Sequence, residues 1–346
     1  MSLPPAIRQW VSLRSKNSLG IAARARYFAR AHAIEDLREA LDWADAQSCD
    51  TLILGGGSNL VFAGDFHGLV LQVSITGRCW REIAKDTAIL ELGAGEPWHE
   101  SVLYAAGAGY RGIENLALIP GTVGAAPVQN IGAYGCELAD ILVDLSALDR
   151  TSGEEVRLGV NDCRFSYRDS LFKQQPGRYV ITRVRLKLSR IRPLQLDYQD
   201  LKDYFSGQDI SHLTPSDVAQ GVMAVRRRKL PDPAQIPNAG SFFKNPVIPI
   251  AQWHRLKDKH PQAVGYPQPT VAKVAAAWLI DQCGWKGYRD SKVGVHSQQA
   301  LVLVNHSDGS GQDVLNLADR IRADVQSRFG IELEMEPGVV GDSRAG

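Results

Sequence analysis

The sequence has no paired-cysteine motif, no excess of one charge and no long apolar run. Its five cysteines are odd in number and widely spaced, without a C-x-x-C pair or a histidine at zinc-ligand spacing. Lys and Arg total 39 against 38 for Asp and Glu, so no global field exists to hold a nucleic acid or an acidic membrane surface. Residues 1–5 lack a signal-peptide pattern, and no segment approaches the length that spans a bilayer. We therefore expect a cytoplasmic, globular protein without a metal site, a nucleic-acid partner or membrane association.

The standard phosphate-binding motifs are absent from the most glycine-rich segment, Gly55-Gly56-Gly57-Ser58-Asn59. A P-loop would need Lys followed by Ser or Thr after its last glycine, and a Rossmann fingerprint would need G-x-G-x-x-G leading into a helix. Consecutive glycines nevertheless offer N–H groups with no Cβ to obstruct an approach, which suits a diphosphate. The alternative interpretation is a tight turn that binds no ligand.

A second segment rich in small residues runs from Ile119 to Gly135. It joins Ile119-Pro120-Gly121-Thr122-Val123-Gly124-Ala125-Ala126-Pro127 to Gln129-Asn130-Ile131-Gly132-Ala133-Tyr134-Gly135. Two such loops indicate an extended ligand, because a dinucleotide cofactor needs N–H donors for its pyrophosphate and close backbone beside its flat ring system. A close-packed crossing of strand and turn is the alternative.

Apolar spacing predicts both helices and strands, which places the chain in the α+β class. Helices are expected at 34–46, from Pro97 to Gly107, from Pro215 to Leu230-Pro231, at 271–279, and at 314–325 up to Gly330; strands are expected at 51–54, 61–62, 69–73, 88–92, 142–148, 156–158, 179–188 and 331–336. The Pro231-Asp232-Pro233 stretch is typical of a domain linker.

At several strings the sequence resembles the UDP-N-acetylenolpyruvoylglucosamine reductases, which make UDP-N-acetylmuramate for bacterial peptidoglycan. The strings include 54–59, 114–116, 119–135, 164–172, 229–233 and, most specifically, Asn-Ala-Gly-Ser-Phe-Phe-Lys-Asn-Pro at 238–246. The resemblance implies a two-part FAD-binding region of the vanillyl-alcohol-oxidase type and a smaller α+β substrate-binding domain. The first part would be residues 1–77 with 331–346 returning to it, the second 78–229, and the substrate domain 230–330.

The resemblance also implies non-covalent FAD, with NADPH as the reductant and no obligate protein partner. Hydride would pass from flavin N5 to the methylene carbon of UDP-N-acetylglucosamine enolpyruvate, which would take the place that NADPH leaves. Family positions that hold FAD correspond here to Leu54, Gly55, Gly56, Gly57, Ser58, Asn59, Ile119, Pro120, Gly121, Thr122, Gly124, Ala125, Gln129, Asn130, Gly132, Ala133, Tyr134 and Gly135. Ala125 lies where some relatives have a hydroxyl side chain, so only its backbone could contact the flavin.

Three residues match the family's catalytic positions. Arg168 would offset the charge that develops on the substrate carboxylate, Glu336 would help to polarise that carboxylate, and Ser241 would give a proton to the α-carbon. Judged without the resemblance, each has an ordinary structural alternative. These are a turn arginine paired with a surface acid, one of three glutamates on a polar strand face, and a serine in a turn.

Substrate-binding positions of the family carry over to a further set of polar side chains that would hold the carboxylate, the diphosphate and the sugar. They are Tyr198, Lys229, Asn245, Tyr266, Lys286 and Gln299. The three arginines before Lys229 are interpreted as a solvated helix end, where cations favour the helix dipole. Pro337-Gly338 follows Glu336 in place of a continuing strand, which bears on where the Glu336 side chain points.

Two other functions remain as alternatives. One is a flavin-dependent alcohol oxidase or dehydrogenase on the same fold, against which Ser241, Lys229 and the 238–246 string argue. The other is a non-catalytic flavoprotein that binds a sugar nucleotide, in which Arg168, Ser241 and Glu336 together would have no purpose.

Overall fold

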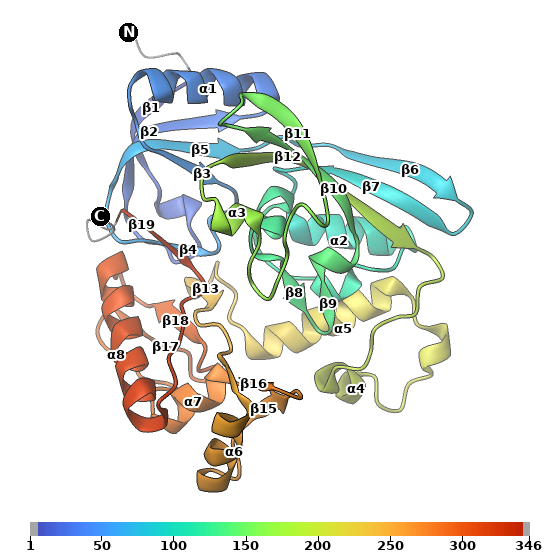
Figure 1. Ribbon diagram of the computed structural model, residues 1–346, viewed down its shortest axis with the longest axis vertical. Coiled ribbons are helices and arrows are strands. Elements are labelled where there is room, and N and C mark those ends of the chain that lie inside the picture. The colour runs from blue at the N-terminus through green and yellow to red at the C-terminus, as the bar shows by residue number, and fades with distance from the viewer. Residues whose placement is uncertain (1–5, 342–346) are drawn as a thin grey trace. The chain divides into compact units, whose positions relative to one another are not determined.

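The computed structural model describes residues 6–341, apart from the side chains of residues 82 and 83, so the expectation for residues 1–5 lies outside it. The chain forms two compact units (Figure 1). The first unit comprises Met1–Val11, Ala25–Gly56 and His67–Arg228, and the second comprises Ser12–Arg24, Gly57–Phe66 and Lys229–Gly346. The chain therefore passes between the units within the first glycine-rich loop, and again at the end of the helix expected from Pro215.

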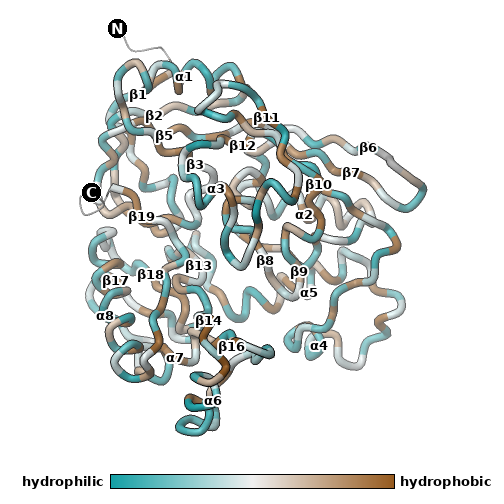
Figure 2. The backbone as a smooth tube through the Cα atoms, viewed as in Figure 1, coloured by the Kyte–Doolittle hydropathy of each residue, from teal (hydrophilic) through white to brown (hydrophobic). Residues whose placement is uncertain are grey.

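The two larger sheets of the first unit share one hydrophobic core with its helices and loops, and hydrophobic stretches along their strands are brown in Figure 2. The larger sheet is antiparallel with the order β11-β10-β12-β7-β6, and the smaller has the order β1-β2-β5-β3, with β3 parallel to β5. Their bounds are β1 Arg8–Ser12, β2 Arg24–Ala31, β3 Thr51–Leu54, β5 Phe66–Val73, β6 Arg78–Ala84, β7 Thr87–Gly93, β10 Leu142–Asp149, β11 Glu154–Gly159 and β12 Tyr179–Ser189.

The helices of the first unit follow the apolar spacing of the sequence. They are α1 Ile34–Ala46, α2 Trp98–Gly107, α3 Leu171–Gln174, α4 Gln199–Tyr204 and α5 Pro215–Lys229. Leu37, Leu41 and Ala44 recur at helical spacing and are all buried in α1. The Thr214 hydroxyl accepts a hydrogen bond from the Asp217 N–H, which caps α5 as the Thr-Pro pair predicts. The expectations for α1, α2 and α5 and for strands 51–54, 88–92, 142–148 and 179–188 are confirmed, whereas the sequence analysis predicted neither α3 nor α4.

The described part of the second unit holds smaller sheets and the α-helices α6, α7 and α8. Its sheets have the orders β13-β18-β17, β14-β16-β15 and β19-β4, the last pair being parallel. The bounds are β4 Leu60–Phe62, β13 Asn238–Ser241, β14 Val247–Pro249, β15 Gly265–Pro267, β16 Val271–Val274, β17 Val293–Val295, β18 Val302–Asn305, β19 Gly338–Val340, α6 Ile250–Lys259, α7 Ala276–Gln282 and α8 Gly311–Phe329. Gly330 ends α8 in the left-handed conformation, as predicted.

Two expectations for the second unit are wrong. The helix expected at 271–279 starts only at Ala276, because Val271–Val274 forms β16 between two partner strands and buries alternate residues. Val271 and Val274 are three residues apart, which indicates one helix face but puts them on opposite faces of a strand. Pairing with β14 and β15 therefore overrides the local spacing. The strand expected at 331–336 has only an isolated bridge, between Phe243 and Met335, and the strand lies instead at Gly338–Val340.

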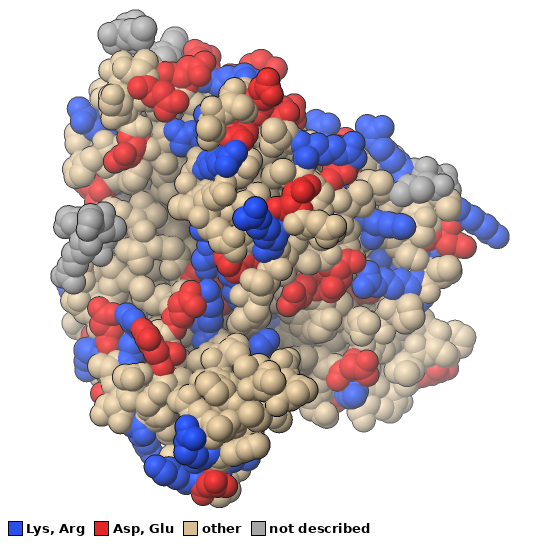
Figure 3. Space-filling model, viewed as in Figure 1, with Lys and Arg blue, Asp and Glu red and all other residues tan. Residues whose placement is uncertain are grey.

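Acidic and basic side chains are mixed across the visible face of the molecule, in keeping with the balanced composition (Figure 3). Within residues 6–341, no helix combines the length and apolar character needed to cross a membrane. Over the same residues, no cluster of three or more His, Cys, Asp or Glu side chains could hold a metal ion.

Ser310→Ala is expected to lower the free energy of unfolding by about 1 kcal/mol at neutral pH. The Ser310 hydroxyl caps α8 by accepting from the Asp313 N–H, and it donates to Asp313 Oδ2 at 2.7 Å. These hydrogen bonds, assisted by Lys292, lower the pKa of Asp313. A lowered folded-state pKa gives stability above the ordinary Asp pKa of about 3.9, and that stability is lost as the pH falls through the folded-state value.

Urea unfolding of Ser310→Ala and of a control, Ser307→Ala, at pH 7 and pH 4 measures this contribution. Ser307 is exposed, and the control should lie within about 0.5 kcal/mol of the native protein at both pH values. The deficit of the Ser310 variant should shrink in acid, and a deficit independent of pH would contradict the assignment to the Asp313 interaction.

Candidate functional site

The two glycine-containing loops are in direct contact within the first unit. A Cβ placed on Gly56 would lie 2.8 Å from the Gly121 Cα, and one on Gly55 would lie 2.6 Å from the Thr122 hydroxyl oxygen. Real Cβ atoms do not approach backbone this closely, so the crossing requires glycine. Gly124 packs in the same way, with its Cβ position 2.6 Å from the Ala94 Cβ. The close-packed crossing considered as an alternative is therefore present.

The crossing leaves backbone donors available to a ligand. The N–H groups of Gly56, Gly121 and Thr122 donate to no acceptor among the described residues, and all three residues are at least partly exposed. Neighbouring N–H groups without internal acceptors form a concavity that suits a phosphate. The remainder of the first loop belongs to the second unit, where Gly57 has φ +66° and its Cβ position lies 1.9 Å from the Lys16 carbonyl oxygen. Within the first unit, the backbone donors of Gly56, Gly121 and Thr122 fit a diphosphate-containing cofactor.

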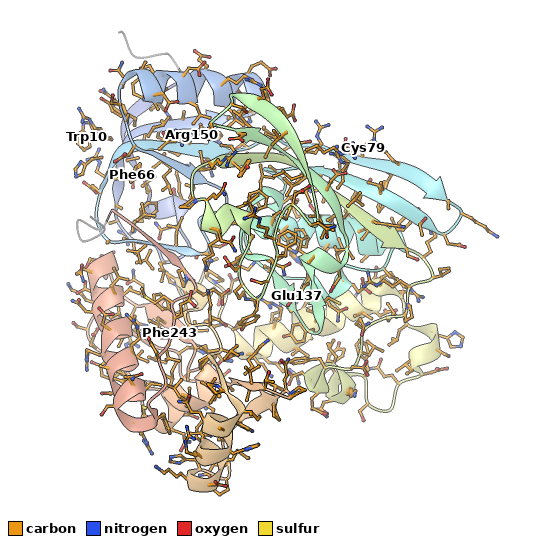
Figure 4. All side chains as sticks on the ribbon, viewed as in Figure 1. Trp10, Phe66, Cys79, Glu137, Arg150 and Phe243 are labelled. Carbon is orange, nitrogen blue, oxygen red and sulfur yellow. The ribbon has the colours of Figure 1, made fainter. Side chains whose placement is uncertain are left out.

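A short hairpin begins within the end of the second glycine-containing segment and gathers several candidate residues. β8 (Gly132–Ala133) pairs with β9 (Cys136–Glu137), and the two turn residues, Tyr134 and Gly135, have φ of 50° and 82°. Positive φ at both positions defines a type I′ turn, where Tyr is an unusual occupant. Asn130, with φ 44°, holds the base of the hairpin by donating from Nδ2 to Glu137 Oε2 at 2.9 Å (Figure 4).

Arg168 and Tyr198 both lie against this hairpin. Arg168 has φ 56°, and its Nη2 donates to the Gly132 carbonyl oxygen at 3.0 Å. The ring of Tyr198 meets the ring of Tyr134 edge to face, with centroids 5.1 Å apart and planes at 78°. The first unit thus brings together one expected catalytic residue, one expected substrate residue and the expected cofactor residues around Gly132.

The expectation of a solvated helix end is wrong for Arg226. Burial lowers the pKa of this guanidinium, and Arg168 adds to the effect by like-charge repulsion. Burial also raises the pKa of the neighbouring Tyr134 hydroxyl, and the positive charge of Arg226 opposes that rise. Helical periodicity could have predicted the burial of Arg226, because it follows buried Val222 by four residues and continues the apolar face of α5. Arg227 and Arg228 are exposed, as expected for a solvated helix end.

Ser241 and Glu336 come together in the second unit. Ser241 ends β13 opposite Val302 of β18, and the next residue, Phe242, accepts a hydrogen bond from the Glu336 N–H at 2.9 Å. The Phe243–Met335 bridge continues the same antiparallel contact, and the side chain of Phe243, labelled in Figure 4, is buried. The Ser241 hydroxyl bonds to no other described residue.

Asn59 and Gln299 lie beside this contact. Asn59 Nδ2 donates to the Glu336 carbonyl oxygen at 3.4 Å, and the Asn59 carbonyl oxygen accepts from the Gly338 N–H at 3.1 Å. Asn59, the last residue of the first glycine loop, therefore binds the backbone at Glu336 and two residues after it. The Gln299 side-chain oxygen accepts from the Leu301 N–H at 3.3 Å in the turn that leads into β18. The expected catalytic pair is thus joined by one expected cofactor residue and one expected substrate residue.

Four other expected substrate residues occupy separate positions. Lys229 is the last residue of α5, and Asn245 accepts a hydrogen bond at Oδ1 from the Ala276 N–H, which caps α7. Tyr266 is exposed on β15, and Lys286 forms an ion pair with Asp281 at 3.7 Å. No hydrogen bond among the described residues links Tyr266 or Lys286 to Ser241.

Comparisons with known proteins agree with this arrangement. Residues 25–159 match the family model of an FAD binding domain, and residues 232–340 match that of the UDP-N-acetylenolpyruvoylglucosamine reductase C-terminal domain. The chain is 50% identical to the UDP-N-acetylenolpyruvoylglucosamine reductase of Pseudomonas syringae pv. tomato and 49% identical to that of Pseudomonas aeruginosa. In each case 96% of this chain and 98% of the relative are covered.

Solved structures show the same fold. The UDP-N-acetylenolpyruvylglucosamine reductase of Thermus caldophilus superimposes with a TM-score of 0.67 over 96% of this chain and 99% of that one, at 24% identity. An alkyldihydroxyacetonephosphate synthase superimposes with a TM-score of 0.50 over 96% of this chain and 79% of that one, at 10% identity. The expected fold class, an FAD-binding region with a smaller substrate-binding domain, is confirmed, and the chain is an FAD-dependent oxidoreductase. The identity over nearly the whole length shows that the chain belongs to the UDP-N-acetylenolpyruvoylglucosamine reductase family.

Proposed function

We propose that this protein reduces UDP-N-acetylglucosamine enolpyruvate to UDP-N-acetylmuramate, with NADPH as the reductant. The observation that carries the proposal is the antiparallel contact that places Ser241 beside Glu336, in the segment that matches the reductase C-terminal domain. Residues 1–77 with 331–346, residues 78–229 and residues 230–330 would serve as two FAD-binding parts and a substrate domain. The reaction consumes one hydride from NADPH and one proton.

The glycine loops are the proposed cofactor site. Non-covalent FAD, when bound there, would carry the hydride from NADPH to the methylene carbon of the enolpyruvyl group. The N–H groups of Gly56, Gly121 and Thr122 would receive the diphosphate. Residues 54–59, 119–125 and 129–135, which contain all the expected cofactor positions, would line its course, and close approach of backbone at Gly121 and Gly124 would suit a flat ring.

Arg168 is proposed to stabilise the negative charge that hydride addition places on the carboxylate side of the substrate. Its hydrogen bond to the Gly132 carbonyl and its turn position hold the guanidinium in one place. A fixed guanidinium presents planar paired donors to a carboxylate, and the nearby Arg226 adds positive potential because it also lies against the hairpin.

Ser241 is proposed to protonate the α-carbon. A serine is a weak acid, but the acceptor is carbanion-like, so the required acidity is low. The Ser241 hydroxyl has no competing acceptor among the described residues, which leaves its proton available. Glu336, held in register by Asn59, would polarise the substrate carboxylate.

Tyr198, Lys229, Asn245, Tyr266, Lys286 and Gln299 are proposed to hold the sugar nucleotide. Lysines suit a diphosphate as mobile point charges. The exposed positions of Tyr198 and Tyr266 leave both rings accessible to a ligand.

An anaerobic titration tests the proposed reaction. The bound flavin is reduced with NADPH, UDP-N-acetylglucosamine enolpyruvate is added, and the flavin absorbance is followed. Prompt return of the oxidised spectrum is expected. Flavin that stays reduced until oxygen is admitted would favour the alcohol oxidase alternative, and protein without flavin would contradict the central proposal.

Gly56→Ala is expected to purify with much less FAD than the native protein, because its Cβ would force the two loops apart at Gly121. Gly107→Ala is the matched control, since nothing lies within 4 Å of its Cβ position and Ala favours a helix. Flavin content per protein, from the absorbance spectrum, distinguishes the two. Full flavin content in Gly56→Ala would contradict the proposed cofactor site.

Arg168→Lys is expected to lower kcat by about 10²- to 10³-fold while the protein keeps its FAD. A lysine loses the planar donors and the hydrogen bond to Gly132. Arg164→Lys is a close control, because Arg164 lies in the same segment with φ 47° but is exposed. Steady-state rates of NADPH oxidation measure both, and equal rates for the two variants would contradict the role of Arg168.

Ser241→Ala is expected to lower the rate of the second half-reaction by about 10²- to 10⁴-fold, the usual contribution of a general acid. Reduction of the flavin by NADPH should remain at the native rate, because no proton is given to the substrate in that step. Stopped-flow absorbance separates the two half-reactions, with Ser307→Ala as the control. Unchanged reoxidation by the sugar nucleotide would show that another group supplies the proton.

A further inference from the structure

Asn115 is a buried polar residue of the first unit to which the proposed reaction gives no role. It lies in the 3-10 helix Glu114–Leu116, and its side chain is 0% exposed. Its Oδ1 accepts from no described residue. A buried acceptor without a donor disfavours the folded state, so an apolar side chain would suit this position better unless the Nδ2 donors have a purpose.

The Asn115 amide joins two segments that are distant in the sequence. Nδ2 donates to the Tyr134 carbonyl oxygen at 3.0 Å and to the Gln195 carbonyl oxygen at 2.8 Å. Both Nδ2 hydrogens are used, and a flipped amide would set Oδ1 against two carbonyl oxygens. The orientation of the amide is therefore determined by its partners.

These two segments carry the tyrosine rings that face each other. Tyr134 begins the I′ turn with φ 50°, a conformation that Tyr keeps only when its surroundings hold it. Gln195 precedes Tyr198 by three residues, and the Tyr134 and Tyr198 rings meet at 5.1 Å. Asn115 holds the backbone of Tyr134 through its carbonyl oxygen.

We propose that Asn115 is a positioning residue for the sugar-nucleotide site. By fixing the carbonyls of Tyr134 and Gln195, it sets the distance at which Tyr198 stands from the hairpin. This inference rests on the proposed function, in which Tyr198 contacts the substrate. Asn115 itself touches neither the substrate nor the cofactor and acts through the two segments that it joins.

Asn115→Leu in the full-length, FAD-loaded protein tests the inference, because Leu is similar in size and has no donor. Asn305→Leu is the matched control: Asn305 is a buried residue of the second unit whose Nδ2 also donates to two carbonyls, those of Leu19 at 2.9 Å and Gly309 at 3.1 Å. Amide hydrogen exchange at 132–137 and at 193–198 should accelerate about tenfold in Asn115→Leu and stay unchanged in the control. Asn115→Ser keeps one short donor and should also accelerate amide exchange in both segments. It replaces Asn115→Leu in the test if the Leu variant does not fold.

Kinetics separate positioning from general destabilisation. Asn115→Leu should raise KM for the enolpyruvyl sugar nucleotide about tenfold and leave kcat within about twofold, since the reacting groups are unchanged. In a Tyr198→Ala background the same substitution should change KM by less than about twofold, because its effect passes through Tyr198. The proposal would be overturned if the KM effects of the two substitutions multiply in the double variant, or if amide exchange accelerates in only one of the two segments.

The proposed function would be overturned instead if the native protein does not turn over the sugar nucleotide. The exchange comparison would then still decide whether Asn115 couples the two segments.

Discussion

The candidate cofactor site depends on one steric constraint, the approach of two backbone segments that only glycine allows. Gly56 meets Gly121 at a distance where no Cβ fits. The N–H groups of Gly56, Gly121 and Thr122 have no acceptor among the described residues, so these donors remain for a ligand. The tight crossing and the binding surface are therefore the same feature, although the sequence first presented them as alternatives.

The candidate residues fall into two groups, and each group is held by hydrogen bonds within its own unit. In the first unit, the I′ hairpin carries Tyr134 and supports Arg168 through the Gly132 carbonyl. In the second, the contact between Phe242 and Glu336 sets Ser241 beside the last expected catalytic residue. In the proposed reaction, Arg168 stabilises charge and Ser241 transfers a proton. The hydrogen bonds that hold these two residues are therefore separate from one another.

Local patterns predicted much of this arrangement, and long-range contacts account for what they missed. The helix at 34–46 and the end of α8 at Gly330 follow from spacing and capping, which neighbouring residues determine. The 271–274 segment could not be assigned locally, because its valines have helical spacing and only the pairing with β14 and β15 makes it a strand. Arg226 was misjudged because its type suggests solvent while its position continues a buried face. Asn115 could not be assigned at all, since its partners lie in two distant segments.

The order in which the chain is made has a consequence for the second unit, which is assembled from residues 12–24, 57–66 and 229–346. Its early pieces leave the ribosome long before the segments that complete it: Asn59 and Glu336 are 277 positions apart, and β4 pairs with β19 at the far end of the chain. Closing so long a loop is entropically costly and slow. The first unit, in contrast, has all its residues once Arg228 is synthesised. Nascent chains should therefore fold the hairpin and glycine crossing first, and gain the Ser241–Glu336 contact only after release.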